Sequence, residues 1–177
     1  MQNNSQIIRR FVEEVLNRGN IEATGQFFWE DVVEQIPFPG QGPGLEGLKD
    51  ILRGMRIGFP DMHWSVEEQI AEGDKVLTRF EWTGTHRGEF LGVPATGRPV
   101  KVWGTVIDRL QDGKIKETRI IMDALGLMMQ LGVFPDFKAA IKVGQPVARL
   151  PPHKSRRAEL QHRAFQRCSL RTQHIDT

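Results

Sequence analysis

The 177-residue sequence predicts an α+β fold, in which helices cover one side of an antiparallel sheet. Two observations lead to this fold class. Apolar residues with helical spacing are concentrated before Pro60, whereas four strand-like runs follow it. Helices and strands that are segregated along a chain in this way are typical of α+β domains, and alternating elements would instead indicate a parallel sheet.

Three helices and one strand are predicted before Pro60. Ser5 is a suitable N-cap for a first helix that ends near residue 18, and a second short helix covers 21–29. Weak alternation predicts a strand over 32–36. The segment PFPGQGPG must be a loop, because its Pro and Gly residues break both periodicities. A third helix then covers 45–55 and is ended by Gly58-Phe59-Pro60.

The region after Pro60 is predicted to form four strands. Short turns at residues 72–74 and 112–113 and a longer loop at 88–99 separate them, as expected for antiparallel neighbours. The predicted strands are His63–Ile70, Lys75–Thr85, Val100–Leu110 and Lys114–Met122.

Alternation sorts the strand side chains into two faces, because successive residues of a strand point to opposite sides of a sheet. In the strand at 75–85, Arg79 and Phe80 lie on opposite faces. In the last strand, Asp123 shares a face with Ile121, and Ile120 lies on the other. Periodicity alone does not determine which face meets the helices.

Composition and charge favour a soluble, cytoplasmic protein without nucleic-acid or membrane partners. Residues 1–132 carry 15 Lys/Arg and 19 Asp/Glu, whereas residues 133–177 carry 9 and 3, so the net charge of +2 comes from the last part of the chain. No apolar run approaches the ~20 residues that span a bilayer. The N-terminus also lacks the basic-then-apolar order of a secretory signal.

We therefore expect a domain over 1–135 and a basic extension over 136–177, flexible or partly helical. Salt-sensitive DNA binding by this extension is a weaker hypothesis. Its Cys168 is the single cysteine, which excludes an intramolecular disulfide. The five histidines lack metal-ligand spacing, so no metal is expected, and the phosphate-binding, dinucleotide-binding and nucleophile-elbow motifs are absent from the sequence.

Asp123 is the candidate catalytic residue with the most unusual surroundings, since it interrupts the apolar run RIIMDALGL. A carboxyl group held among Ile and Met side chains would have a raised pKa, which suits abstraction and return of a proton next to a carbonyl. Alternatively, Asp123 is the N-cap of the following helix, and bonds from the first-turn N–H groups would lower its pKa. Local sequence leaves both interpretations open.

Other polar and aromatic strand residues could complete a pocket. Arg79 could bind an anionic substrate group, or it could form an ordinary cross-strand ion pair. His63 and His86 could assist proton transfer, although each could equally be structural. Trp82 and Trp103 could form a flat wall for a polycyclic substrate, or serve as core and sheet-face residues.

A series of landmarks between Phe59 and Gly132 resembles one known family. They are FPD with a following His-Trp, the EGD turn, Arg79, GTHRGEFLGVPATG, DGKI with Glu117, and an Asp at the start of a helix that ends QLG. In this order they resemble the SnoaL-like polyketide cyclases, or ester cyclases, of the nuclear-transport-factor-2-like superfamily. The resemblance extends over roughly residues 5–132.

The resemblance implies a strongly curved antiparallel sheet that forms a cone around a pocket plugged by the N-terminal helices. It also implies a homodimer formed through the outer sheet face. The aspartate that matches Asp123 would be the general acid/base of an intramolecular aldol condensation that closes a polyketide ring. No metal or organic cofactor takes part in that reaction.

On this basis Asp123 and Arg79 are predicted to be catalytic, acting on a small hydrophobic, polycyclic or β-dicarbonyl substrate. Gly104 and Val106 stand where the cyclases carry a polar residue, often histidine. The predicted substrate pocket consists of Gln35, His63, Trp82, His86, Trp103, Arg119 and Ile121.

Two other functions remain open at this point. One is a non-catalytic hydrophobic ligand-binding protein of the same fold. The other is an epoxide hydrolase, in which Asp123, Arg79 and either Asp61 or Asp108 would activate water.

Overall fold

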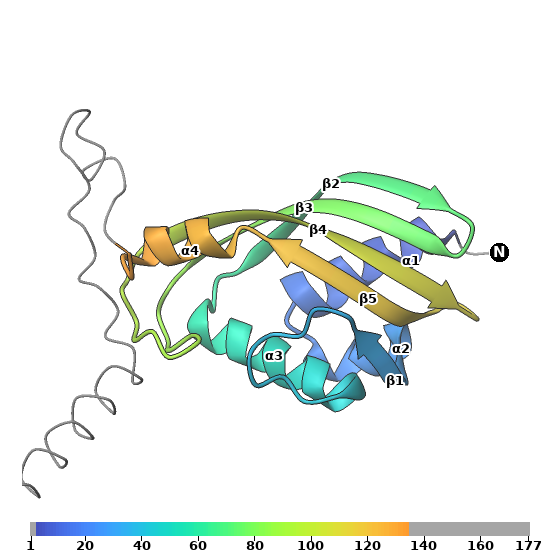
Figure 1. Cartoon of the computed structure of the whole chain (residues 1–177), viewed down its shortest axis with the longest axis horizontal. Helices are drawn as coiled ribbons and strands as arrows, with labels where there is room; N and C mark the ends of the chain where they lie inside the picture. Colours follow the sequence, from blue (N-terminus) through green and yellow to red (C-terminus); the bar gives the residue numbers. More distant parts are fainter. Residues whose placement is uncertain (1–2, 135–177) are drawn as a thin grey trace, which may run out of the picture. The chain divides into compact units, whose positions relative to one another are not determined.

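A five-stranded sheet forms the body of the protein, and helices α1, α2 and α3 lie against one of its faces (Figure 1). The computed structural model describes residues 3–134, so the predicted extension over 136–177 and Cys168 lie outside the described residues. The strands follow the spatial order β1-β5-β4-β3-β2. They are β1 (Phe28–Glu34), β2 (His63–Glu72), β3 (Lys75–Thr85), β4 (Pro99–Gln111) and β5 (Lys114–Met122).

The predicted α+β class is confirmed, with one change in sheet topology. β2 to β5 pair in antiparallel fashion, as expected from their short connections. β1 was predicted as part of an antiparallel sheet, but it pairs with β5 in parallel. The long connection through α3 and three further strands allows this direction, because a parallel pair needs a crossover rather than a hairpin.

The N-terminal helices differ from the sequence prediction at their ends. The side chain of Asn3, not that of Ser5, caps the first helix by accepting a 3.1 Å hydrogen bond from the Ser5 N–H. The predicted helix over 21–29 ends at Phe27, because Phe28 already pairs with Ile115 of β5. The helical elements are α1 (Asn4–Phe11), the π-helical η1 (Val12–Asn17), the 3-10 helix η2 (Ile21–Ala23), α2 (Thr24–Phe27), α3 (Gly44–Gly58) and α4 (Ala124–Leu131).

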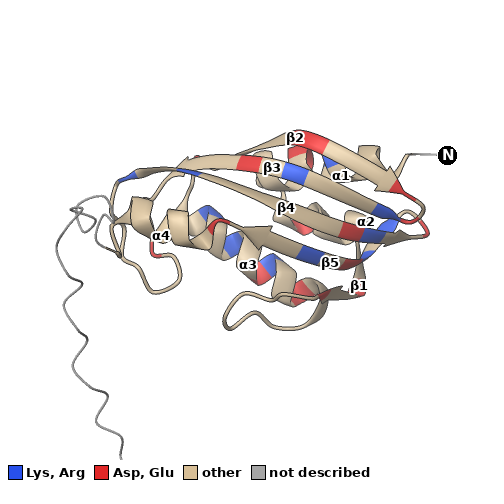
Figure 2. Ribbon diagram, turned by 45° about the horizontal axis from the view of Figure 1, so that its top comes forward, with Lys and Arg blue, Asp and Glu red and all other residues tan. Residues whose placement is uncertain are grey.

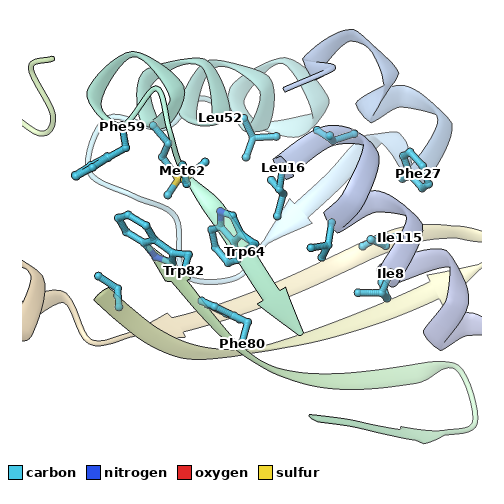
Figure 3. Close-up of a cluster of buried hydrophobic side chains, with 14 of the residues drawn as sticks. Ile8, Leu16, Phe27, Leu52, Phe59, Met62, Trp64, Phe80, Trp82 and Ile115 are labelled. Carbon is cyan, nitrogen blue, oxygen red and sulfur yellow. The ribbon is translucent and has the colours of Figure 1, made fainter. Parts of the chain in front are cut away.

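The hydrophobic core lies between the helices and the inner face of the sheet (Figure 3). Its centre is aromatic: Phe59 packs edge-on against Trp82 at 5.1 Å, and the rings of Trp64 and Phe80 are 4.5 Å apart. Such pairs contribute about 0.5–1.5 kcal/mol each beyond the area they bury. The core thus fixes α3 and the start of β2 against β3.

Burial identifies the face of each strand that meets the helices. Phe80 and Trp82 of β3 are buried, whereas Arg79 is exposed, so the even-numbered residues of β3 face inward. In β5 the inner face carries Thr118, with Ile120 and Met122 packed against the core, while Ile121 faces outward. This assignment decides which side chains can reach an internal cavity.

Candidate functional site

A small apolar cavity lies between the inner face of the sheet and helices α1 and α3. Its volume is about 90 Å³. Ile8 and Phe11 of α1, Leu52 and Met55 of α3, and Trp64 of β2 are among the apolar residues that line it. The polar side chains on its wall are Glu34, Gln41, Thr78, Asp108 and Thr118.

Three of these polar residues form one row across neighbouring strands. Glu34 at the end of β1 is the register partner of Thr118 in β5, and Thr118 is the partner of Asp108 in β4. Directly paired residues have Cβ atoms about 4.5–5.5 Å apart on the same face of a sheet. The row therefore brings two carboxyl groups to the same wall of an apolar cavity, with a hydroxyl between them.

Asp108 is the most perturbed of these groups. Its side chain is buried, with only 4% of the residue exposed. Burial raises the pKa of Asp108 to about 7, against an ordinary value of 3.8, because the ionised form loses its hydration. A hydrogen bond from the Thr118 hydroxyl lowers this pKa, and the nearby charge of Glu34 raises it further.

Glu34 is half-buried beside the same wall. Burial raises the pKa of Glu34, and hydrogen bonds from backbone N–H groups oppose this shift. One of these bonds comes from Ile36 N–H to Oε1 at 3.0 Å. Glu34 is thus held in place by the chain that leads out of β1, with its carboxyl group at the cavity.

This arrangement is suited to proton transfer near neutral pH. A group with a pKa near 7 exists in both protonation states, so it can remove a proton from a substrate and return it later in the same reaction. The apolar walls would hold a hydrophobic molecule and exclude water around the transferred proton.

A comparison with known protein families identifies the family of the chain. Residues 6–131 match the model of the SnoaL-like polyketide cyclases. The chain belongs to this family. The resemblance noted in the sequence is thereby confirmed.

Individual relatives agree with this assignment to the SnoaL-like family. The chain is 31% identical over 128 residues to the aklanonic acid methyl ester cyclase DnrD of Streptomyces peucetius, which covers 66% of this chain and 88% of that protein. Among solved structures, IdmH of Streptomyces antibioticus has a TM-score of 0.65 at 32% identity, covering 74% of this chain and 99% of IdmH. TsrD of Streptomyces laurentii has a TM-score of 0.68 at 28% identity, covering 73% of this chain and 95% of TsrD.

Asp123, the predicted acid/base of this SnoaL-like chain, occupies the N-cap of α4. Its Oδ1 accepts a 2.8 Å hydrogen bond from the Gly126 N–H. The structure does not place Asp123 on the cavity wall. Strand alternation explains this. Ile120 and Met122 point to the inner face of β5, and Asp123, the next residue, falls on an odd-numbered position like the outward-facing Ile121.

The remaining predicted site residues do not line the cavity either. Trp103 and Ile121 are each 60% exposed on the outer sheet face. Gln35 is exposed and accepts a 2.7 Å hydrogen bond from Arg119 Nε. His63 is exposed at the start of β2.

Trp82 and His86 are buried in the core, next to Phe59. Trp82 contacts Phe59 edge-on, and the His86 ring stacks on the Phe59 ring with their centroids 5.1 Å apart. Nδ1 of His86 accepts a 3.3 Å hydrogen bond from the Thr96 N–H, and burial lowers the pKa of this histidine. Both residues are therefore part of the core, and neither lines the cavity.

The structure does not bring together the groups of the Asp–Arg–Asp hypothesis. Arg79 points outward and pairs with Glu68 at 3.4 Å, whereas Asp108 points into the cavity from the opposite face. Asp61 accepts 2.7 Å hydrogen bonds from the backbone and hydroxyl of Thr85. Among residues 3–134 there is no cluster of His, Cys, Asp or Glu that could hold a metal ion.

From the sequence, Asp108 was considered only as one possible member of the alternative Asp–Arg–Asp arrangement, because its neighbours, IDRLQDGK, are typical of a polar strand end that leads into a turn. The signal that could have identified it is alternation over the whole strand. Asp108 falls in phase with Val102, Val106 and Leu110, so it is an acid on the apolar face of β4.

We predict that Asp108→Asn stabilises the protein at neutral and alkaline pH. A carboxyl group whose pKa rises on folding favours the folded state most at a pH below its unfolded value, and this contribution is lost as the pH rises through the folded value of about 7. Relative to Asp108→Asn, the wild-type free energy of unfolding should fall by up to about 4 kcal/mol between about pH 4 and pH 8.

Urea denaturation at several pH values measures this difference. Asp112→Asn is the matched control, because Asp112 is exposed in the turn between β4 and β5. It should show the pH dependence of the wild type. Parallel curves for wild type and Asp108→Asn would contradict the raised pKa of Asp108.

Proposed function

We propose that this SnoaL-like protein is an acid/base catalyst for hydrophobic carbonyl compounds, with Asp108 as the group that transfers the proton. The observation that carries the proposal is a buried carboxyl group with a pKa near 7 on the wall of an apolar cavity. The reaction is an aldol-type ring closure, or an isomerisation that proceeds through the same enolate.

The proposed ring closure begins with Asp108 in its ionised form. The carboxylate takes a proton from the carbon next to a substrate carbonyl, and the electron pair of the broken C–H bond forms an enolate. The enolate carbon then bonds to a second carbonyl carbon of the same molecule, whose oxygen becomes an alkoxide. Asp108 returns its proton to this alkoxide, so the enzyme ends in its starting state.

Glu34 supports this cycle through its charge. The negative charge of an ionised Glu34 disfavours a second negative charge on Asp108. It therefore raises the pKa of Asp108, so the Asp108 carboxylate is a stronger base and is more readily protonated.

The relatives support a carbonyl compound as the substrate, since DnrD is named as an aklanonic acid methyl ester cyclase. The substrate class proposed here is therefore a hydrophobic, polycyclic or β-dicarbonyl compound.

The assignment of Asp108 competes with the prediction that Asp123 is the acid/base. Asp123 has a structural role as the α4 cap, and its carboxylate is committed to the Gly126 N–H. Asp108 has an apolar environment and lines the cavity. Asp108 lies on β4 and Asp123 caps α4, so single substitutions separate their roles.

We predict that the protein accelerates hydrogen–deuterium exchange at the carbon next to the carbonyl of 2-tetralone, a bicyclic ketone. Proton NMR in D₂O follows the exchange directly. Its rate should rise with pH and level off above about pH 7, as Asp108 ionises. Asp108→Asn should reduce the rate by about 100-fold or more, the usual contribution of a general base.

Asp123→Asn distinguishes the two candidate bases in the same assay. Asparagine is also a good N-cap, so this variant should fold and keep the exchange rate within about threefold. Loss of exchange in Asp123→Asn, with retention in Asp108→Asn, would instead identify Asp123 as the acid/base. Binding of 2-tetralone without exchange in the wild type would favour the non-catalytic ligand-binding protein.

We also propose that the outer sheet face forms a homodimer. Trp103, Ile107 and Ile121 are exposed together on neighbouring strands β4 and β5. Charged residues border this apolar area, because Arg119 of β5 is the register partner of Ile107 and Glu81 of β3 is that of Trp103. Figure 2 shows charged bands on β3 and β5 beside the uncharged part of β4. A contiguous exposed apolar area on a sheet is characteristic of an interface between protein chains.

We predict that Ile121→Glu weakens self-association, because it places a charge in the centre of this apolar face. Ile57→Glu is the matched control, since Ile57 is 65% exposed and lies on α3. Sedimentation velocity across a range of concentrations should show dimers for the wild type and Ile57→Glu, and monomers for Ile121→Glu. Dimers of unchanged stability in Ile121→Glu would exclude this face as the interface.

A further inference from the structure

Gln41 reaches the cavity from the loop between β1 and α3. Phe38 and Gln41 are half-buried and line the cavity, whereas most residues around them are exposed. A local turn holds the two residues together, because the Gln41 N–H donates to the Phe38 carbonyl at 2.9 Å. The loop is also packed closely on α3, because a Cβ atom on Gly47 would clash with the Gly42 carbonyl oxygen.

The orientation of the Gln41 amide is fixed by its partner. Its Oε1 accepts a 3.0 Å hydrogen bond from the Phe38 N–H. Because a backbone N–H can only donate, the side-chain atom it meets must be the oxygen, and the Gln41 NH₂ group must point elsewhere. This NH₂ group makes no hydrogen bond to another residue in the described part of the chain.

Gln41 lies at the junction of the cavity and an outer groove, because it lines both. This groove has a volume of about 330 Å³ and runs along the end of β1 and the start of α3. The residues that line both the cavity and the groove are Glu34, Gln41, Leu48 and Thr118. The junction therefore combines a carboxyl group, a hydroxyl and an amide that can donate.

The sizes of the two spaces restrict the molecules that fit. An engineered cavity of about 150 Å³ holds a single benzene ring, so the inner cavity of about 90 Å³ holds less than one ring. A larger molecule can place only its reacting end inside, while the rest lies in the groove. The oxygen of a carbonyl group at that reacting end would then pass the junction beside Gln41.

We propose that Gln41 is a substrate-binding residue, whose NH₂ group donates a hydrogen bond to the carbonyl oxygen of an elongated ketone placed across the junction. The inner cavity takes the carbon next to this carbonyl, beside Glu34 and Asp108, and the groove takes the remaining rings or chain. The same hydrogen bond stabilises the enolate oxygen when the proton is removed. This inference rests on the proposed function for its chemical meaning, although the binding it predicts can be measured without turnover.

The experiment compares 2-tetralone with tetralin, which has the same two rings but no carbonyl oxygen. Isothermal titration calorimetry on the full chain measures the affinity of both ligands. Wild type should bind 2-tetralone more tightly than tetralin. Gln41→Leu should weaken binding of 2-tetralone by about 3- to 12-fold, as expected for one lost hydrogen bond, and leave the affinity for tetralin within about twofold.

Gln41→Glu distinguishes loss of the NH₂ donor from loss of the hydrogen bond that Gln41 accepts from the Phe38 N–H within the loop. A glutamate keeps an oxygen that accepts from the Phe38 N–H, but its carboxylate has no N–H to donate. At pH 8 this variant should lose affinity for 2-tetralone to at least the same extent as Gln41→Leu. Gln26→Leu is the control for the substitution itself, since Gln26 is exposed on α2, and it should bind both ligands as the wild type does.

Three results would overturn the role of Gln41. They are wild-type affinity for 2-tetralone in Gln41→Glu, an equal loss for both ligands in Gln41→Leu, and no binding of 2-tetralone by the wild type. Failure of the proposed reaction gives a different pattern. In that case the wild type binds 2-tetralone in a Gln41-dependent manner but does not accelerate deuterium exchange.

Discussion

The loss of water around the Asp108 carboxyl group is the physical constraint on which the proposed chemistry depends. An acid on the apolar face of a central strand is unfavourable when it is ionised, and this penalty raises its pKa to about 7. The fold creates the penalty by packing α1 and α3 over the inner face of β4. The same packing leaves the small cavity beside the carboxyl group, so the tuned acid and the space for a substrate have one origin.

The row formed by Glu34, Thr118 and Asp108 depends on sheet topology as well as on burial. Glu34 reaches Thr118 only because β1 joins the sheet in parallel next to β5. The loop that leaves β1 then adds Phe38 and Gln41 to the lining of the same cavity. One crossover connection therefore supplies both the second carboxyl group and the hydrogen-bond donor that we assign to the substrate oxygen.

Much of the fold could be predicted from the sequence, because the helical and strand periodicities are strong and local. The alternation around Phe80 correctly separated the two faces of β3, and the family landmarks indicated the SnoaL-like fold. The parallel pairing of β1 could not be predicted, since it depends on contacts between Phe28 and Ile115, which are distant in the sequence.

The candidate site was less predictable for a related reason. Asp123 stood out because its neighbours along the chain are apolar, but an N-cap next to a hydrophobic helix has the same local appearance. The neighbours of Asp108 that matter are across the sheet and on α1 and α3, and no short stretch of sequence contains them. Trp103 and Ile121 illustrate the same limit, because apolar side chains on the outer face of a sheet resemble pocket residues until the inner face is known.

Titration of the Asp108 carboxyl carbon by ¹³C NMR in the full-length protein measures the pKa of Asp108 directly, with Asp108→Asn used to assign the signal. We expect a midpoint near pH 7, well above the ordinary aspartate value of 3.8. Glu34→Gln should shift this midpoint downward, because the nearby negative charge is removed. A midpoint near 4 in the wild type would exclude Asp108 as the acid/base, since it would then be an ordinary ionised carboxylate.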